Sequence, residues 1–142
     1  MRISLSLCLL IFLLPAGRVE AAGSVVGLGD SLIDTGNFSI STLGAIPPAP
    51  LYYNGRFSNG PVWIEVLANQ LGLAGPTPSL SGGTNYAFNG ARLAGASPYM
   101  TPDITTQAGW YLASVGGMAS PDDLFVISGG ANDLFFSLAR GP

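Results

Sequence analysis

The first candidate for chemistry is Ser31, which follows a glycine and an aspartate in the segment VVGLGDSLIDTGNFS, residues 25–39. The apolar residues before it predict a strand buried on both faces, from Ser24 to Leu28, so Ser31 falls in the turn after a strand. A serine hydroxyl becomes a nucleophile when a neighbouring base takes its proton. The chain contains no histidine, so the sequence offers Ser31 without the residue that most often acts as that base.

Two other candidate residues also follow predicted strands. The segment TNYAF is compatible with a short strand that runs into the turn containing Gly90. The segment SPDDLFVISGGANDLFF predicts a turn, an apolar strand, a Gly-rich turn with Asn132 after it, and the start of a helix. Parallel sheets place their chemistry in the loops at the carboxyl ends of their strands. Ser31, Gly90 and Asn132 all fall just past such ends.

A first helix is predicted from about Pro61 to Leu71. Proline suits the first helical position, Ser58 or Asn59 can cap the helix, and Gly72 ends it. The helical spacing predicts a buried stripe made of Trp63, Val66, Leu67 and Leu71.

A second helix is predicted in the segment TPDITTQAGWYLASVGG. Thr101 is the expected cap, Pro102 begins the first turn, and Asp103 is favourable near the positive end of the helix. Apolar residues recur at helical spacing, and we expect them to face the core: Ile104, Ala108, Tyr111, Leu112 and Val115.

Composition favours one globular domain. The 142 residues are 48% hydrophobic and 9% charged, with no lysine and a net charge of -3, which excludes a disordered tail and gives no basic surface for nucleic acid. Strands alternate with helices, and residues 39–58 form a loop rich in proline and Asn-Gly, which predicts an α/β fold with a parallel sheet. The sequence has no cofactor motif, metal-ligand cluster or phosphate-binding loop.

The N-terminal residues have the pattern of a secretory signal peptide. Arg2 precedes an apolar stretch from Ile3 to Leu14, and small residues follow in the segment VEAAG. Cleavage after Ala21 or Ala22 is expected, so residues 1–21 are the signal and residues 22–142 the mature chain, secreted or periplasmic. The alternatives are a membrane anchor or a buried helix, but a membrane span needs roughly 20 apolar residues.

Four segments in order resemble the signature blocks of GDSL lipases and esterases, in the SGNH hydrolase superfamily. They are GLGDSLIDTGN, GRFSNGPVWIEVLA, GGTNYAFNGARL and ISGGANDLFF, and the resemblance runs from about Val25 to Phe136. It implies a three-layer α/β/α sandwich with a parallel, flavodoxin-like sheet, truncated at the C-terminus. It also implies a serine ester hydrolase that acts on a small-molecule or lipid ester and needs no cofactor.

The resemblance also implies roles for individual residues. Ser31 matches the nucleophile, the backbone N–H of Gly90 matches one donor to the oxyanion, and the amide of Asn132 matches another, with the N–H of Ser31 as a third. Donors already aimed at the developing oxyanion stabilise it at little reorganisation cost. In the alternative interpretation Ser31 is a helix cap or a turn residue, Gly90 is a turn residue and Asn132 caps a helix. Asp30, Asp34 and Asn37 are expected to order the loop around Ser31, and Arg56 and Phe57 either line the acyl site or support a loop.

The sequence departs from the family in its base. The family uses a histidine in an Asp-x-x-His block near its C-terminus, whereas this chain has no histidine. We therefore expect the chain to be the N-terminal part of an SGNH hydrolase domain and to be inactive alone. The alternative is an inactive secreted module that binds acyl or sugar esters. Lipids, short-chain esters and acetylated polysaccharide all remain open as substrates.

Overall fold

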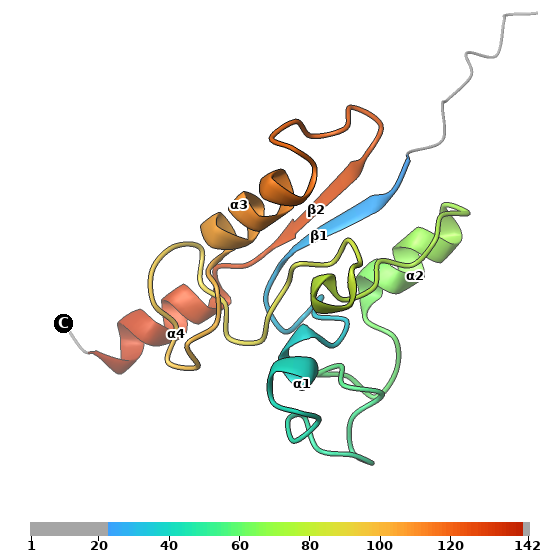
Figure 1. The fold of residues 1–142 in the computed structure, drawn as a ribbon. Helices are drawn as coiled ribbons and strands as arrows, with labels where there is room; N and C mark the ends of the chain where they lie inside the picture. The colour runs from blue at the N-terminus through green and yellow to red at the C-terminus, as the bar shows by residue number, and fades with distance from the viewer. Residues whose placement is uncertain (1–22, 141–142) are drawn as a thin grey trace, which may run out of the picture.

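The computed structural model describes residues 23–140, so the expected signal peptide lies outside the described residues. Within residues 23–140 the chain forms two strands, four α-helices and a short 3-10 helix, whose arrangement Figure 1 shows. In chain order they are β1 (Val25–Gly29), α1 (Asn37–Ser41), α2 (Trp63–Gln70), η1 (Ser79–Ser81), α3 (Ile104–Ser114), β2 (Leu124–Ser128) and α4 (Ala131–Ala139). Within residues 23–140, none of the helices is long and apolar enough to cross a membrane.

The two strands form a parallel pair at the centre of the fold. Their register runs from Val25 opposite Leu124 to Gly29 opposite Ser128. β1 is buried along its whole length, because it contacts other segments on both faces and at both edges. The predictions of a buried strand before Ser31, of a second strand before Asn132 and of a parallel sheet are confirmed.

The segment at residues 84–88 lies along the other edge of β1. Gly27 donates its N–H to the carbonyl of Thr84 at 3.0 Å, and Tyr86 and Phe88 donate to the carbonyls of Gly27 and Gly29 at 2.7 and 3.0 Å. It forms isolated parallel bridges, from Asn85 to Gly27 and from Asn85 to Pro78, in place of the short strand with which the sequence is compatible. The segment still runs parallel to β1 and leads into the turn that contains Gly90, as expected from the sequence.

Helices cover both faces of the strands. Figure 1 shows α2 and α3 on opposite sides of β1 and β2. One apolar cluster joins Val25 and Val126 to Ile64 and Ala68 of α2, and the other joins Val26 and Leu28 to α3. Successive side chains of a strand point to opposite faces, so β1 supplies both clusters.

The prediction for the buried face of α2 is largely wrong. Ile64 and Ala68 are the buried residues, Leu67 packs against them, and three of the four predicted residues are about half exposed: Trp63, Val66 and Leu71. Apolar residues surround most of this helix, so the sequence pattern did not locate the centre of the stripe. Polar contacts orient the helix instead: Glu65 accepts the N–H of Val62 at 2.9 Å and pairs with Arg56 at 2.8 Å.

That ion pair gives Arg56 a structural role. Its guanidinium also donates to the carbonyl of Asn54 at 2.7 Å, so Arg56 ties the preceding loop to α2. The structure therefore favours the loop-supporting interpretation of Arg56 over a place in an acyl site.

The buried face of α3 is partly as predicted. Ile104 and Tyr111 are buried and Ala108 packs against their cluster, whereas the exposed positions of Leu112 and Val115 contradict the prediction. Leu112 directly follows the buried Tyr111 and so lies about 100° around the helix from it, and Val115 is the C-cap residue after the last helical position. Asp103, not Thr101, caps the helix, because its carboxylate accepts the N–H of Thr106 at 2.7 Å.

Candidate active site

Ser31 lies in a tight turn directly after β1. Asp30 donates its N–H to the carbonyl of Ser128 on β2 at 3.2 Å, and its own carbonyl accepts the N–H groups of Ile33 and Asp34 at 3.2 and 3.1 Å. The carboxyl of Asp30 is buried and accepts the N–H of Leu32 at 3.0 Å. These bonds confirm that Asp30 orders the turn, and they hold the partly buried Ser31 at the carboxyl end of the strand.

Asn132 connects the Ser31 turn to the Gly90 turn. Its amide nitrogen donates to the carbonyl of Ala91, next to Gly90, at 2.8 Å. The same nitrogen lies 3.4 Å from the carboxyl of Asp30, next to Ser31. Asn132 therefore contacts the neighbours of both other candidates, although the three positions are far apart in the sequence.

Asn132 does not cap α4. The N-cap position belongs to Gly130, which has a φ of 103° and makes no side-chain cap, and Asn132 is the second residue of the helix. Its side chain points instead toward Ala91 and Asp30. The capping interpretation of Asn132 is therefore wrong.

The next residue of α4 strengthens the same connection. Asp133 accepts the N–H of Leu93 at 2.9 Å and pairs with the guanidinium of Arg92 at 3.2 Å. Two successive residues at the start of α4 thus bind three successive residues after Gly90. This arrangement fixes where the Gly90 turn lies relative to α4.

Gly90 adopts a backbone conformation that favours glycine. Its φ is +73°, and a Cβ at this position would collide with the ring of Tyr99. Gly90 and Asn132 line one cavity of about 290 Å³, whose other walls include Tyr99, Phe135 and Phe136. Two of the three candidates therefore face the same mostly apolar hollow.

Asp34 holds the loop after Ser31. This carboxyl is fully buried and accepts four backbone N–H groups, from Gly36, Asn37, Phe38 and Asn89, at 2.7 to 3.1 Å. Burial raises the pKa of Asp34, and the four donors act against that rise. The bond from Asn89 also ties this loop to the residue before Gly90, so the expected structural role of Asp34 is confirmed.

Two buried asparagines extend this network. Asn37 donates to the carbonyls of Asn85 and Ala87 at 2.8 and 3.0 Å, as its predicted loop-holding role requires. Asn85 donates to the carbonyl of Ile33 at 2.6 Å and accepts the N–H of Ala87 at 2.9 Å. Sequence reasoning missed Asn85, whose position in the TNYAF segment suggested only a strand residue.

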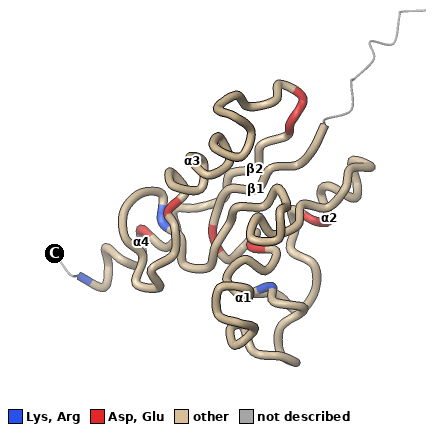
Figure 2. Tube along the Cα trace, viewed as in Figure 1, with Lys and Arg blue, Asp and Glu red and all other residues tan. Residues whose placement is uncertain are grey.

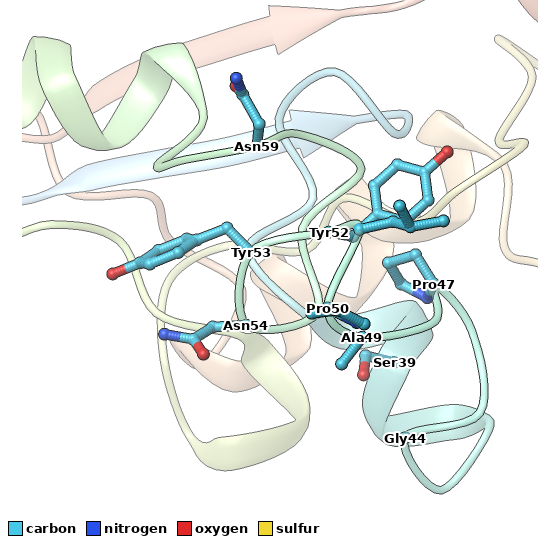
Figure 3. A pocket seen from close by; sticks show the side chains of 11 residues that line it. Ser39, Gly44, Pro47, Ala49, Pro50, Tyr52, Tyr53, Asn54 and Asn59 are labelled. Carbon is cyan, nitrogen blue, oxygen red and sulfur yellow. The ribbon is translucent and has the colours of Figure 1, made fainter.

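A larger hollow lies away from these residues. It has a volume of about 460 Å³ and is formed by the loop around residues 39–59. Figure 3 shows Tyr52, Pro47 and Ser39 among its walls. Its lining contains none of the three candidates, so cavity size does not locate the site in this chain.

The charged side chains near the candidates bind the surrounding loops: Asp30 and Asp34 accept backbone N–H groups, and Arg92 pairs with Asp133. Figure 2 shows acidic and basic positions scattered along residues 23–140, with no run of basic residues in that part of the chain. No group of three or more potential metal ligands occurs among the same residues.

Asp30 gives folding a predictable pH dependence. Burial raises the pKa of its carboxyl above the ordinary 3.8, and the hydrogen bond from Leu32 acts against this rise. The folded protein holds this proton more tightly than the unfolded chain does. The stabilising contribution of Asp30 is therefore complete below pH 3.8 and is lost as the pH rises through the raised value.

Because this contribution is lost, the free energy of unfolding should fall as the pH rises. We expect Asp30→Asn to make this fall smaller between about pH 4 and pH 7, as measured by urea unfolding at several pH values. The quantity to compare is the slope of the free energy of unfolding against pH, because the substitution also changes the absolute stability at every pH. Asp122→Asn, at an exposed position before β2, is the matched control. An Asp30→Asn slope equal to that of the unmodified protein would contradict the assignment.

The arrangement as a whole places three loops at the carboxyl ends of a parallel α/β sheet: one with a serine after the first strand, one with a glycine turn, and one that leads into a helix with an asparagine at its start. A family model described as GDSL-like Lipase/Acylhydrolase matches residues 25–140. The chain belongs to this family, as its four sequence blocks indicate.

Three curated relatives illustrate the similarity. A phosphatidylcholine-sterol acyltransferase of Aeromonas hydrophila is 37% identical over 84% of this chain and 37% of its own length. A GDSL esterase/lipase of Arabidopsis thaliana is 34% identical over 68% of the chain and 32% of its length. A thermolabile hemolysin of Vibrio parahaemolyticus is 36% identical over 89% of the chain and 28% of its length. The chain thus spans about a third of the length of these relatives.

Proposed function

We propose that this chain supplies the nucleophile and the oxyanion donors of a secreted serine ester hydrolase. The observation that carries the proposal is the Asn132 side chain, which lies between the residue before Ser31 and the residue after Gly90. A purely structural asparagine need not connect these two turns. Membership of the GDSL-like lipase/acylhydrolase family supports the same assignment.

In the proposed reaction the Ser31 oxygen attacks the ester carbonyl and transfers its proton to a base. The N–H groups of Ser31 and Gly90, with the amide of Asn132, stabilise the negative charge that develops on the carbonyl oxygen. Asn132 keeps its 2.8 Å bond to Ala91 and exchanges the 3.4 Å contact with Asp30 for the oxyanion. The protonated base then gives its proton to the departing alcohol, and water releases the acyl group from Ser31.

The base is proposed to be a histidine outside these 142 residues. The chain has none, and without a base a serine hydroxyl is a weak nucleophile near neutral pH. The family resemblance places such a histidine in an Asp-x-x-His block. The product of the complete reading frame that contains this chain is called the full-length protein.

The complete domain is proposed to be a three-layer α/β/α sandwich with flavodoxin-like strand order. Residues 84–88, β1 and β2 lie side by side in that order, so the first strand of the chain is central. A flavodoxin-like sheet begins its order in this way. The apolar clusters on both sides of β1 support the three layers.

Acyl esters of lipids are the proposed substrates. The relatives are named as a phosphatidylcholine-sterol acyltransferase and an esterase/lipase, among others. The cavity beside Gly90 and Asn132 is lined mainly by apolar and aromatic side chains, which suits an acyl group. The proposed activity needs no cofactor and no nucleic acid.

One experiment tests export and the nucleophile together. The medium, periplasm and cytoplasm of the expressing cells are separated, and the full-length protein is purified from the fraction that contains it and treated with a fluorophosphonate, which modifies activated serines. We expect intact-mass analysis to place the N-terminus at Ala22 or Gly23, and peptide mapping to place the label on Ser31. Labelling should follow from activation of the serine by its base.

Two outcomes would contradict this proposal separately. A retained Met1 would overturn export, and labelling that persists in Ser31→Ala would overturn the nucleophile. An unlabelled but folded full-length protein would favour the alternative, an inactive module that binds acyl or sugar esters. Ser81→Ala, at an exposed position in η1, is the control that should be labelled normally.

A further inference from the structure

The side chain of Gln107 in α3 is fully buried and binds the main chain of β1. Its amide oxygen accepts the N–H of Gly29 at 2.7 Å, and its amide nitrogen donates to the carbonyl of the same residue at 2.9 Å. The second N–H of the amide donates to the carbonyl of Pro102 at 3.1 Å. One glutamine therefore clamps both polar groups of Gly29, which lies two residues before Ser31.

The Gln107 amide takes the place of one inter-strand hydrogen bond of the sheet. Residues 84–88 bond to β1 through the N–H of Gly27, the carbonyl of Gly27 and the carbonyl of Gly29. A regular parallel ladder would next use the N–H of Gly29 as a donor to Tyr86. That N–H donates to Gln107 instead. This exchange of hydrogen-bond partner explains why residues 84–88 do not form a regular strand. It also links the end of β1 to α3.

The end of β1 is confined on its other side as well. A Cβ on Gly29 would collide with the carbonyl of Ser128 on β2 and with the side chain of Ile33. Asp30, the next residue, donates its N–H to that same carbonyl. The main chain leading to Ser31 is thus held by β2 on one edge and by the Gln107 amide on the other.

We infer that Gln107 is a positioning residue for the nucleophile. Its amide fixes the peptide groups of Gly29 and so places the Ser31 hydroxyl relative to the donors of Gly90 and Asn132. The inference rests on the proposed function, because it assigns Gln107 a part in a reaction at Ser31. A displacement of about 1 Å at a reacting group can reduce the rate about 10²-fold, even when the substituted residue is remote from the chemistry.

Two substitutions of Gln107 in the full-length protein test the clamp. Gln107→Met fills similar space but cannot bind Gly29, so kcat should fall about 10²-fold with little change in KM. Gln107→Glu keeps an acceptor for the N–H of Gly29 but, when ionised, offers no donor to the carbonyls of Gly29 and Pro102. Protonation restores one O–H donor.

The glutamate variant therefore has a distinctive pH profile. Its kcat relative to the unmodified enzyme should rise as the pH is lowered, because the buried carboxyl gains a proton and can again donate to Gly29. The ratio for Gln107→Met should stay constant. Gln70→Glu and Gln70→Met, at the exposed end of α2, are the matched controls and should retain normal kcat. If Gln107→Met does not fold, Gln107→Glu at low pH still supplies the test.

Hydrogen exchange at the amide of Gly29 separates failure of this inference from failure of the proposed function. We expect Gln107→Met to accelerate that exchange while leaving the amide of Val126 in β2 protected. Unchanged protection of Gly29 would overturn the clamp whatever the enzyme does. Faster exchange with normal kcat, in a protein that Ser31→Ala inactivates, would overturn the positioning role alone. Full activity in Ser31→Ala would overturn the proposed function instead.

Discussion

Asn132→Ala is expected to lower kcat of the full-length protein by about 10² to 10³, with a smaller effect on KM. The proposed contact between the Asn132 amide and the substrate oxygen strengthens as negative charge develops. Removing it therefore raises the barrier by about 2.7 to 4 kcal/mol. Steady-state hydrolysis of a p-nitrophenyl ester, corrected by titration of active serines, measures this effect.

The same substitution should also reduce stability, and the two effects must be separated. Without the Asn132 amide, the buried carbonyl of Ala91 loses its 2.8 Å donor, which costs about 1 to 3 kcal/mol in the free energy of unfolding. Asn69→Ala, on an exposed position of α2, is the matched control. A lower melting temperature with normal kcat per folded molecule would show that Asn132 has only a structural role.

The central part of the fold was predictable because local pattern and topology agree there. The apolar run before Ser31 has the length and the bounding glycine of a buried strand, and a parallel sheet follows from the alternation of strands and helices. Since parallel strands end at one edge, the closeness of Ser31, Gly90 and Asn132 followed from the order of the elements. The contact of Asn132 with both turns agrees with that expectation.

The helix faces were less predictable because their apolar patterns are broad. In α2 the side chains on most of the circumference are apolar, so the pattern did not distinguish Ile64 from Val66. The position of Glu65, which pairs with Arg56, helped to decide the orientation. This ion pair joins a loop residue to a helix residue, and the periodicity of the helix alone gives no information about it.

Gln107 and Asn85 were missed because their roles depend on distant main-chain groups. Gln107 binds Gly29, 78 positions away, and Asn85 binds Ile33, 52 positions away. One signal for Gln107 was available: it falls three residues after Ile104 and four before Tyr111, on the apolar stripe of its helix. A polar residue on such a stripe is expected to have buried partners, since burying it without them is costly.

The most direct test of the central claim compares ester hydrolysis by the full-length protein with that of its Ser31→Ala variant. The account assigns the attack to Ser31, so the substitution should reduce kcat by about 10⁶-fold, the scale seen when a serine nucleophile is removed. Ser81→Ala, at an exposed serine, should leave the rate unchanged.

The same assay applied to residues 1–142 alone measures the contribution of the missing base. Because this chain has no histidine, any hydrolysis by it should be the same with and without Ser31. The account predicts a Ser31-dependent rate in the full-length protein and none in the 142 residues. A full-length Ser31→Ala protein that is folded and hydrolyses esters at the unmodified rate would contradict it.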